Sequence, residues 1–314
     1  MEEVITYNQV KGYDPTHTTS LRNAFARNMR RRFAELITVI RKSVNTNDCF
    51  SLKPNGITIL QMTPIPRPFI FLRSSEKIEA FMEWLQKQVD LGILQVGVAK
   101  QVGNAVENAW TNIYILDSYK RGVMRAVDEM KKAGINVTSV EQRGGIQAIM
   151  GLPFHIDRVG LLYTRAYSEL KGITEAMDTI ISRILAQGMV DGDSPALLAR
   201  KLVASINGTG VGDLSLTDSI GRFIPAMRRA DILARTEIIR AHHVAMVQEY
   251  RNWGVEGIMV KGEWKTAGDE RVCEKCAELE GRIFTLDEIE GMIPYHPQCR
   301  CIALPYIEEL QKYK

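Results

Sequence analysis

The cysteine residues near the end of the chain carry the most specific chemistry in this sequence. Four of the five cysteines lie between positions 273 and 301, the first two as Cys-x-x-Cys and the last two within a His-Pro-x-Cys-x-Cys run. Two such turns present thiolates and one imidazole, which are ligands that tetrahedral Zn²⁺ prefers. The pattern therefore predicts one bound zinc ion, with the candidate ligands Cys273, Cys276, His296, Cys299 and Cys301.

Five candidate ligands compete for the four places around such an ion. Cys273, Cys276 and His296 are the first choices, while Cys299 and Cys301 leave the fourth ligand open, and both Cys₃His and Cys₄ sets can be built. Either set fills the coordination shell and leaves no position for water. The zinc site is therefore predicted to be structural rather than catalytic.

The composition is that of an ordinary globular protein. The chain has 314 residues, 45% hydrophobic and 25% charged, which is enough for two domains. Its first residues lack the pattern of a signal peptide and no apolar run reaches the length of a membrane span, so we expect maturation in the cytoplasm without membrane contact. Thiols stay reduced there, which favours a metal site over a disulfide framework and leaves Cys49 as an inert apolar residue.

Net charge alone does not indicate a nucleic-acid binder, because it is only +3. The segment from Arg22 to Lys42 nevertheless holds seven basic residues against the single acid Glu35. A solvated helix face is the favoured interpretation. A contact with DNA or with an acidic partner is the alternative, through Arg27, Arg30, Arg31 and Arg32.

Most of the chain has the apolar spacing of helices, which must position the cysteine cluster. We expect one helix from the Thr18–Ser20 cap to before Asn45, and a second from Ser74 to Gly92. Further helices are expected at 105–132, 157–187, 195–207 and 226–253, the last closed by Gly254, with irregular segments at 52–73, 136–153 and 208–212. The break near residue 193 predicts a mainly helical N-terminal domain over 1–192, with its Pro-rich segment near 52–73, and a second domain over 193–314.

Beyond residue 255 the spacing changes to short strands, at 256–266, 281–286 and 300–305. About 60 residues of short strands bury too little apolar surface to be stable alone, so a metal cross-link is needed there. The fold class is therefore predicted as α+β, with a zinc-stabilised β subdomain over about 255–305.

Several short motifs in this region occur together in a recognisable order. They are Ala234–Glu237, Arg240–His242, Gly254–Val255, Glu263–Cys273, Leu279–Gly281 and His296–Cys301. In this order and spacing they resemble the Mu-F-like family of phage head morphogenesis proteins, over residues 194 to 305. The helical segments before residue 192 resemble the N-terminal half of many such proteins less specifically.

The resemblance implies a minor head protein rather than an enzyme. Such a protein is expected to act at the portal vertex during procapsid assembly, in the host cytoplasm and then in the virion. The partners implied are the portal protein and, less directly, scaffolding or major capsid protein, and a contact with packaged DNA is left open. Family members vary in whether they carry the first cysteine pair, so Cys273 and Cys276 indicate a metal-binding member.

The other motif residues are expected to act in structure. Arg235 and Glu237 lie two apart on a helix, so they cannot pair with each other and are expected to lock the helix to the strand region through Asp269, Arg271 or a backbone group. His242 is expected in the core or at an interface rather than on a metal. Trp264 is expected in the small core of the zinc subdomain, together with Trp253 and Tyr295.

Two alternative functions use the same cysteines. A zinc-dependent nuclease would need a second, open metal site, for which only Asp269, His242 and His243 lie nearby in sequence. A zinc-ribbon nucleic-acid binder would need basic residues around the cysteines, but residues 269 to 309 hold ten acidic residues and four basic ones. Both alternatives are therefore less favoured than a structural head protein.

Overall fold

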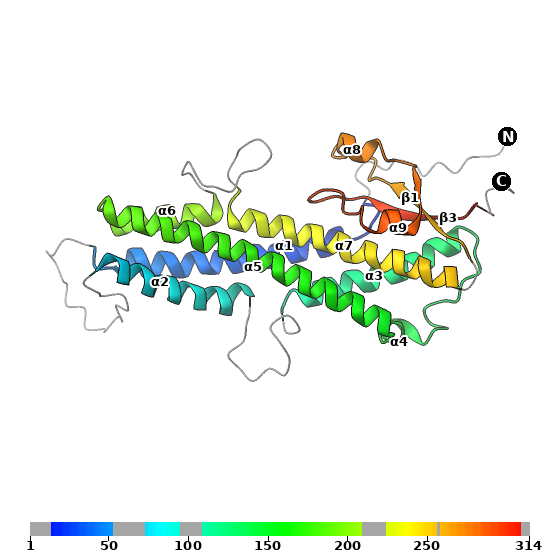
Figure 1. Cartoon of the computed structure of the whole chain (residues 1–314), viewed down its shortest axis with the longest axis horizontal. Coiled ribbons are helices and arrows are strands. Elements are labelled where there is room, and N and C mark those ends of the chain that lie inside the picture. Colours follow the sequence, from blue (N-terminus) through cyan, green and yellow to red (C-terminus); the bar gives the residue numbers. More distant parts are fainter. Residues whose placement is uncertain (1–13, 53–72, 95–108, 209–223, 256–257, 309–314) are drawn as a thin grey trace. The chain divides into compact units, whose positions relative to one another are not determined.

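The computed structural model describes residues 14–52, 73–94, 109–208, 224–255 and 258–308. Over these residues the chain is mainly helical, with a small three-stranded sheet near its C-terminal end (Figure 1). The predicted combination of helices and short C-terminal strands is confirmed. None of the described helices has the length and apolar character that crossing a membrane requires.

The chain forms two compact units that interleave along the sequence. Unit 1 consists of Met1–Phe25, Thr111–Ala166 and Ile232–Lys314, and unit 2 of Ala26–Trp110 and Tyr167–Asp231. Three long helices contribute residues to both units, namely α1 (Thr19–Arg41), α5 (Pro153–Val190) and α7 (Ala226–Val255). The domain boundary predicted near residue 193 is not tested by this division into units, so it stays a prediction.

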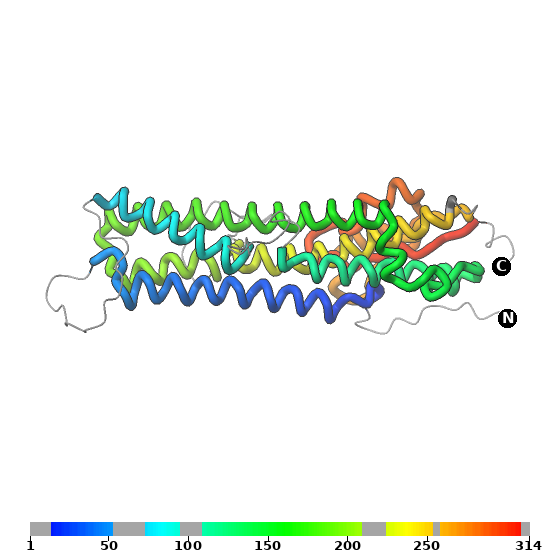
Figure 2. Tube along the Cα trace, turned by 90° about the horizontal axis from the view of Figure 1, so that it is seen from below, coloured from blue at the N-terminus to red at the C-terminus, as the bar shows by residue number. Residues whose placement is uncertain are grey.

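Unit 2 is built from helices packed on an apolar core. Besides its parts of α1 and α5, it contains α2 (Ser74–Val89), α6 (Pro195–Asn207) and two π-helical turns, Lys42–Thr46 and Asp90–Leu94. The helices α1, α2, α5 and α6 run lengthwise beside one another in both views (Figures 1 and 2). Their facing apolar residues are almost completely buried, as the helical spacing predicts: Phe33, Ile40, Phe81, Leu85, Ile181, Leu185, Leu198 and Leu202.

Unit 1 is organised around α7, which packs against α3 (Asn112–Lys132). The hydroxyl of Ser118 donates a hydrogen bond to the backbone oxygen of Ile238, at 2.6 Å. One turn further along α3, a Cβ added at Gly122 would lie 2.3 Å from the backbone oxygen of His242. Glycine is therefore required at position 122, because only a residue without a side chain lets the two helix backbones approach so closely.

The C-terminal end of unit 1 forms a small subdomain, here called the cysteine module (residues 261–306). Its elements are β1 (Lys261–Lys265), α8 (Glu274–Ala277), β2 (Ile283–Phe284), α9 (Leu286–Glu290) and β3 (Ile302–Tyr306). The strands are antiparallel in the order β2-β1-β3, and Trp264 lies opposite Ala303. Trp264, Ile289, Ile293 and three of the cysteines form one buried cluster with Ile239 and Val247 of α7.

The caps of two helices follow the sequence directly. Ser194 accepts a hydrogen bond from the backbone N–H of Leu197, and Pro195 opens α6 at its first position, as predicted. Thr285 and Glu288 form a reciprocal capping box at the start of α9. These local signals explain why both helices begin where they do.

Several predicted boundaries were wrong. The segment 136–153 is not only irregular, since it contains α4 (Gly145–Met150). The helix expected from Asp157 begins at Pro153, and it continues past Gly188, where the missing side chain leaves room for Asp193. The helix expected to close at Gly254 continues to Val255. The helix expected from residue 105 begins at Asn112, with residues 95–108 outside the described part of the chain.

Two of the predicted irregular segments cannot be compared with the structure. Most of the Pro-rich segment (53–72) and nearly all of the glycine-rich loop (209–212) lie outside the described residues.

Candidate metal centre

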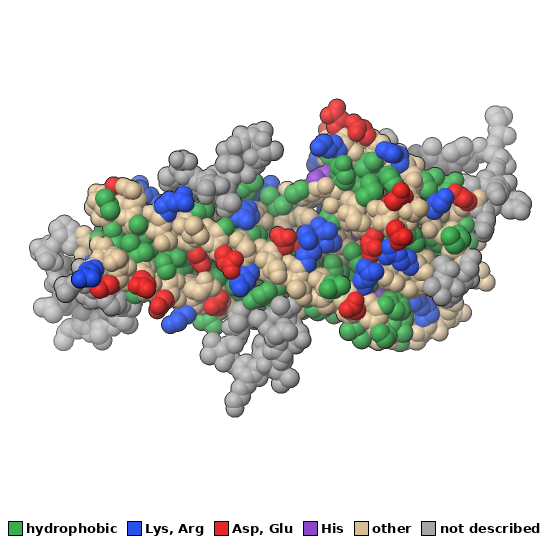
Figure 3. Space-filling view, in the orientation of Figure 1, with side chains coloured by type: hydrophobic (Ala, Val, Ile, Leu, Met, Phe, Trp, Pro, Cys, Tyr) green, Lys and Arg blue, Asp and Glu red, His purple; other side chains and the backbone are tan. Residues whose placement is uncertain are grey.

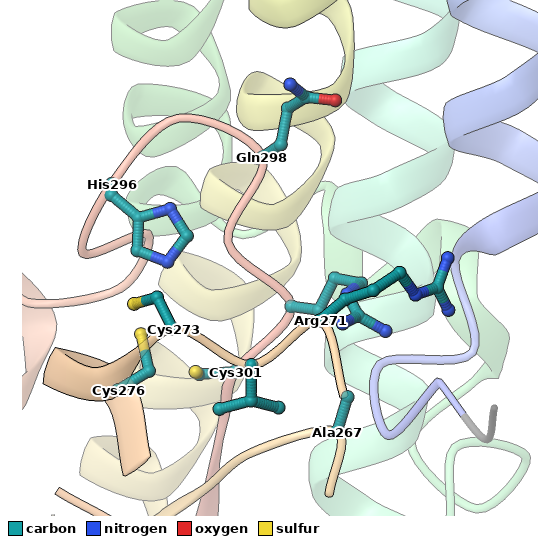
Figure 4. Close-up of a pocket in the computed structure, with 9 residues that line it drawn as sticks. Ala267, Arg271, Cys273, Cys276, His296, Gln298 and Cys301 are labelled. Atoms are coloured by element: carbon teal, nitrogen blue, oxygen red, sulfur yellow. The ribbon is translucent and has the colours of Figure 1, made fainter. Parts of the chain in front are cut away.

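The first pair of candidate ligands comes from one tight turn at the start of α8. Cys273 is the residue before the helix, with extended backbone angles, and Cys276 lies inside it. The backbone N–H of Ala277 donates to the oxygen of Cys273 at 3.0 Å, which holds the turn closed. Both thiols therefore point to the same side, as Figure 4 shows.

The second group of ligands comes from the turn before β3. Gln298 adopts a left-handed backbone conformation (φ 63°), and the N–H of Cys299 donates to the backbone oxygen of His296 at 3.1 Å. The Nδ1 of His296 lies 2.8 Å from the backbone oxygen of Pro297. A carbonyl can only accept, so Nδ1 is the donor. Nε2 is then the ring nitrogen that could bind a metal, in the arrangement usual for a metal-bound histidine.

The structure brings all five candidate ligands together. Ligand atoms of Cys273, Cys276 and His296 lie within 4.8 Å of one another, and so do those of Cys276, Cys299 and Cys301. Cys276 belongs to both groups, and Cys301 lines the same pocket as the first group (Figure 4). The donor set fits a tetrahedral soft metal. The choice between Cys299 and Cys301 stays a prediction.

The surroundings of three of the thiols shift their pKa values in different directions. Burial, followed by the neighbouring Cys299, raises the pKa of Cys276 to about 12. A hydrogen bond from Cys301, with further backbone hydrogen bonds at Cys301 and Tyr295, lowers the pKa of Cys299 to about 5. The same bond to Cys299 raises the pKa of Cys301. The thiolate of Cys299 is therefore stabilised here, and ionising Cys276 or Cys301 as well would require a bound cation.

An ion pair holds the two ligand turns against each other. The guanidinium of Arg300 donates to both carboxylate oxygens of Asp269, at 2.6 and 2.5 Å, and Arg271 donates to the same carboxylate at 2.9 Å. The Arg300 hydrogen bond is the largest cause that keeps the pKa of Asp269 far below its usual range. Asp269 precedes the first cysteine pair and Arg300 separates the second, so this bidentate contact fixes their relative position.

The cysteine module is also tied to α7. The backbone N–H of Gln298 donates to the hydroxyl of Thr236 at 3.0 Å, and Nε2 of His243 donates to the backbone oxygen of Ile289 at 2.9 Å. Trp264 is completely buried, whereas Tyr295 is 46% exposed and stands edge-on to its ring. Trp264 lies in the core cluster of the cysteine module, as predicted, and Tyr295 lies at its rim. The placement predicted for Trp253 was wrong, because Trp253 is buried in a different cluster, with residues of α3 such as Val127 and Met130.

One comparison with known proteins identifies this part of the chain. The model of the family described as Phage Mu protein F like protein matches residues 179–304. These residues are similar to the Mu-F-like family. The match contains α7, all but the last two residues of the cysteine module and every candidate ligand, and it indicates a phage head morphogenesis protein. Neither curated proteins nor solved structures gave a match to the chain.

Two motif residues of the Mu-F-like segment have different partners from those predicted. Glu237 is buried and accepts hydrogen bonds from Arg165 of α5 and Arg240 of α7, not from Arg271. Arg235 donates to the side chain of Asn23 in α1 at 2.8 Å. The residue between them, Thr236, makes the contact with the ligand turn. Sequence reasoning missed Thr236 and Arg300, although both stand inside the quoted motifs.

The two histidines of α7 are core residues of the Mu-F-like segment. Burial lowers the pKa of His242 to about 3 and that of His243 to about 4, so both are neutral. Within the described residues, both groups that could hold a metal consist of cysteines and His296, without these histidines. The core role expected for His242 agrees with this arrangement.

The basic residues of α1 lie outside the Mu-F-like segment and are used in different ways. Arg22 is buried against Asp14, at 2.6 Å. Arg32 lies over the ring of Trp110 and donates to the backbone oxygen of Gly92 at 2.5 Å, so it is a packing residue. Arg27, Arg30 and Arg31 remain on the surface. The four arginines predicted as one contact surface therefore do not act as one set.

Proposed function

We propose that this protein is a structural component of a phage head that acts in procapsid assembly at the portal vertex. The observation that carries the proposal is the Mu-F-like match over residues 179–304, which contains α7 and the whole ligand cluster. The protein would assemble in the host cytoplasm and remain in the virion. Its partners would be the portal protein and, in the same particle, scaffolding or major capsid protein.

The cysteine module would hold one structural Zn²⁺. The ligands would be Cys273, Cys276, His296 and either Cys299 or Cys301. The burial of the Cys276, Cys299 and Cys301 thiols and the contact of Nδ1 of His296 with a backbone oxygen support this assignment. A bound Zn²⁺ would supply no reaction step, because four protein ligands close its coordination shell. It would join the α8 turn to the β3 turn, where short strands provide little other stabilisation.

The ligand set can be tested by metal analysis of the purified protein. We expect one zinc ion per chain, and its loss in Cys273→Ser, Cys276→Ser and His296→Ala. Comparing Cys299→Ser with Cys301→Ser identifies the fourth ligand, since only one of them should lose zinc. Cys49→Ser is the matched control, because Cys49 is a buried cysteine of unit 2 and should leave the zinc content unchanged. A purified wild-type protein without metal would contradict the assignment.

The assembly role can be tested by coexpression with the cognate portal protein. We expect the wild-type chain and Cys49→Ser to co-sediment with portal or procapsids, and Cys276→Ser to associate less because its module is unfolded. Parallel gradients with scaffolding and major capsid protein test the other partners. Lack of association with any of these proteins would contradict the proposed function, whatever the zinc content.

The arrangement of the module gives little support to the two alternatives. For a nuclease, Asp269 is occupied by Arg300 and Arg271, and both His242 and His243 are buried. For a zinc ribbon that binds nucleic acid, the tip of the module near α8 exposes acidic side chains, including Glu274 and Glu278 (Figure 3). We expect no plasmid cleavage with Mg²⁺ or Mn²⁺, and cleavage lost in His242→Ala would contradict the non-enzymatic proposal.

A further inference from the structure

Unit 2 carries a compact group of exposed arginines, here called the arginine cluster: Arg27, Arg30, Arg31 and Arg228. The first three lie at positions i, i+3 and i+4 of α1, which places them on one helix face. Arg228 comes from the first turn of α7. The side chains of Arg30, Arg31 and Arg228 are 45%, 65% and 55% exposed.

A buried carboxylate joins the two helices of the cluster. Asp231 is only 3% exposed, and its two oxygens lie 3.3 Å from Nη1 of Arg30 and 3.4 Å from Nη1 of Arg228. Two guanidiniums from different helices are therefore held near the same point. This fixed position lowers the conformational entropy that they would lose on binding a ligand.

The cluster has more positive than negative charge. Within the described part of the chain, its carboxylate partners are Asp231 and Glu35, and the Arg31–Glu35 pair is 3.9 Å long and well exposed, so water screens it. Among the described residues, no ion pair is formed by Arg27. Like charges one turn apart on a helix repel each other. Among the described residues, four arginines against two carboxylates thus leave a net positive charge on this surface.

The side chains of the cluster are suited to phosphate oxygens. All four are arginines, whose planar guanidinium groups can donate two parallel hydrogen bonds to an oxyanion. Arg27 and Arg31 are separated by about 6 Å along the helix axis. One strand of a nucleic-acid duplex carries a phosphate about every 3.4 Å along its axis, so this separation corresponds to nearly two phosphate steps. Two guanidiniums at this distance can therefore contact different phosphates of one strand.

A protein partner fits this surface less well. Protein interfaces are usually centred on apolar or aromatic anchors. On α1, the one large hydrophobic side chain exposed among the described residues is Val39, two turns beyond Arg31. We propose that the arginine cluster binds the phosphate backbone of nucleic acid without reading its sequence, with Asp231 as a positioning residue.

This inference is independent of the metal centre and of the portal contact. It also separates Arg32 from the cluster, because Arg32 packs on Trp110, and it adds Arg228, which is two hundred residues away in sequence. Binding of nucleic acid can be tested without the other head proteins, because the experiment needs only the purified full-length chain.

The experiment is fluorescence anisotropy with a labelled 20-base-pair duplex at 50 and 200 mM salt. For Arg27→Gln with Arg31→Gln, we expect about a tenfold weaker affinity at 50 mM salt. The slope of log K against log salt should fall by about two, one for each lost phosphate contact. Arg183→Gln is the control, because Arg183 is an exposed arginine of the same unit on α5, and it should change affinity less than twofold.

Three results would overturn the inference. They are an unchanged affinity in the double variant, a salt slope near zero in the wild-type chain, and an equal loss in Arg183→Gln. A fourth is displacement of the duplex by polyglutamate at equal charge concentration, which would assign the cluster to an acidic protein segment instead. Circular dichroism of each variant distinguishes lost contacts from lost folding.

Discussion

The helical unit 2 and the cysteine module solve the problem of stability in different ways. Unit 2 uses α2 and α6, of 16 and 13 residues, together with the longer parts of α1 and α5. Their apolar faces bury large side chains such as Phe33 and Phe81. The module has strands of five, two and five residues. Three of the ten buried residues in its core cluster are cysteines. Where elements are too short to bury an apolar face, polar and metal-binding groups must hold them together.

The two regions also differ in which titratable groups they contain. All five histidines of the chain belong to unit 1, and four of the five cysteines belong to the module. Unit 2 instead contains Asp178, whose pKa is raised to about 7 by burial and by the nearby carboxylates of Asp90 and Glu175. Metal removal and acid should therefore act on the two regions differently.

Metal removal should give the largest difference between the two regions. Structural zinc contributes on the order of 10 kcal/mol in small zinc domains. A strong chelator should therefore unfold the cysteine module and leave unit 2 folded. Hydrogen exchange followed by mass spectrometry is the measurement, with peptides from β1 and β3 losing protection while peptides from α2 and α6 keep it. Equal loss of protection in both regions would mean that the module does not depend separately on its metal.

Acid should change the stability of unit 2 and of the helical part of unit 1 in opposite directions. His242 and His243 have lowered pKa values in the folded chain, so below pH 6.5 the unfolded chain binds more protons than the folded one. The stability that their neutral forms provide above pH 6.5 is therefore lost as the pH falls. At pH 5 this loss should reach a few kcal/mol for the helical part of unit 1. Asp178 has a raised pKa when folded, so protonation below pH 7 stabilises unit 2.

The acid effect can be measured as hydrogen exchange at pH 7 and pH 5, corrected for the intrinsic exchange rates. Peptides from α7 should lose protection on acidification. Peptides from α6 should gain protection on acidification in the wild-type chain, but not in Asp178→Asn. If protection in α7 were the same at both pH values, the two buried histidines would not be neutral.

The sequence predicts the parts of the fold that depend on local signals. The apolar spacing of α1 and α2, the Ser194–Pro195 cap and the three short strands were all found near their predicted positions. The candidate ligands were also found together, because a turn of Cys-x-x-Cys and a turn of His-Pro-x-Cys-x-Cys each fix their own geometry. These features require no knowledge of distant residues.

The parts that the sequence did not predict depend on contacts between distant residues. Glu237 pairs with Arg165 and the guanidinium of Arg300 holds Asp269, and neither pairing has a sequence spacing that indicates it. The interleaving of the two units has the same origin, since three helices are long enough to contribute to both. The length of α5 was underestimated because Gly188 was taken as a stop, whereas it provides room for Asp193.

A methyl group at Gly122 should have the next largest effect, and it should act on helix packing rather than on the metal. In Gly122→Ala the new Cβ would lie 2.3 Å from the backbone oxygen of His242, which cannot move without shifting α7. We expect a loss of about 3 kcal/mol in the free energy of unfolding, measured in urea, with unchanged zinc content.

The matched control for this substitution is Gly160→Ala. Gly160 lies inside α5, and a Cβ there would meet no atom within 4 Å. This change should stabilise the protein by up to about 1 kcal/mol, because alanine is the better helix former. If Gly122→Ala were as stable as Gly160→Ala, α3 and α7 would not require the close contact at Gly122.

The smallest expected effect comes from Asp269→Asn, which tests the ion pair between the two ligand turns. The change removes the charge that holds Arg300 and Arg271, and a charge-assisted bond of this kind contributes about 2 kcal/mol. Asp287→Asn is the control, because Asp287 is 91% exposed and its pair with Arg251 should contribute less than about 0.5 kcal/mol. The zinc affinity of Asp269→Asn, measured by competition with a chromogenic chelator, should fall about tenfold, since contacts behind metal ligands have effects of this size. If zinc affinity and stability both stayed at the wild-type values, the cysteine ligands alone would position the two turns.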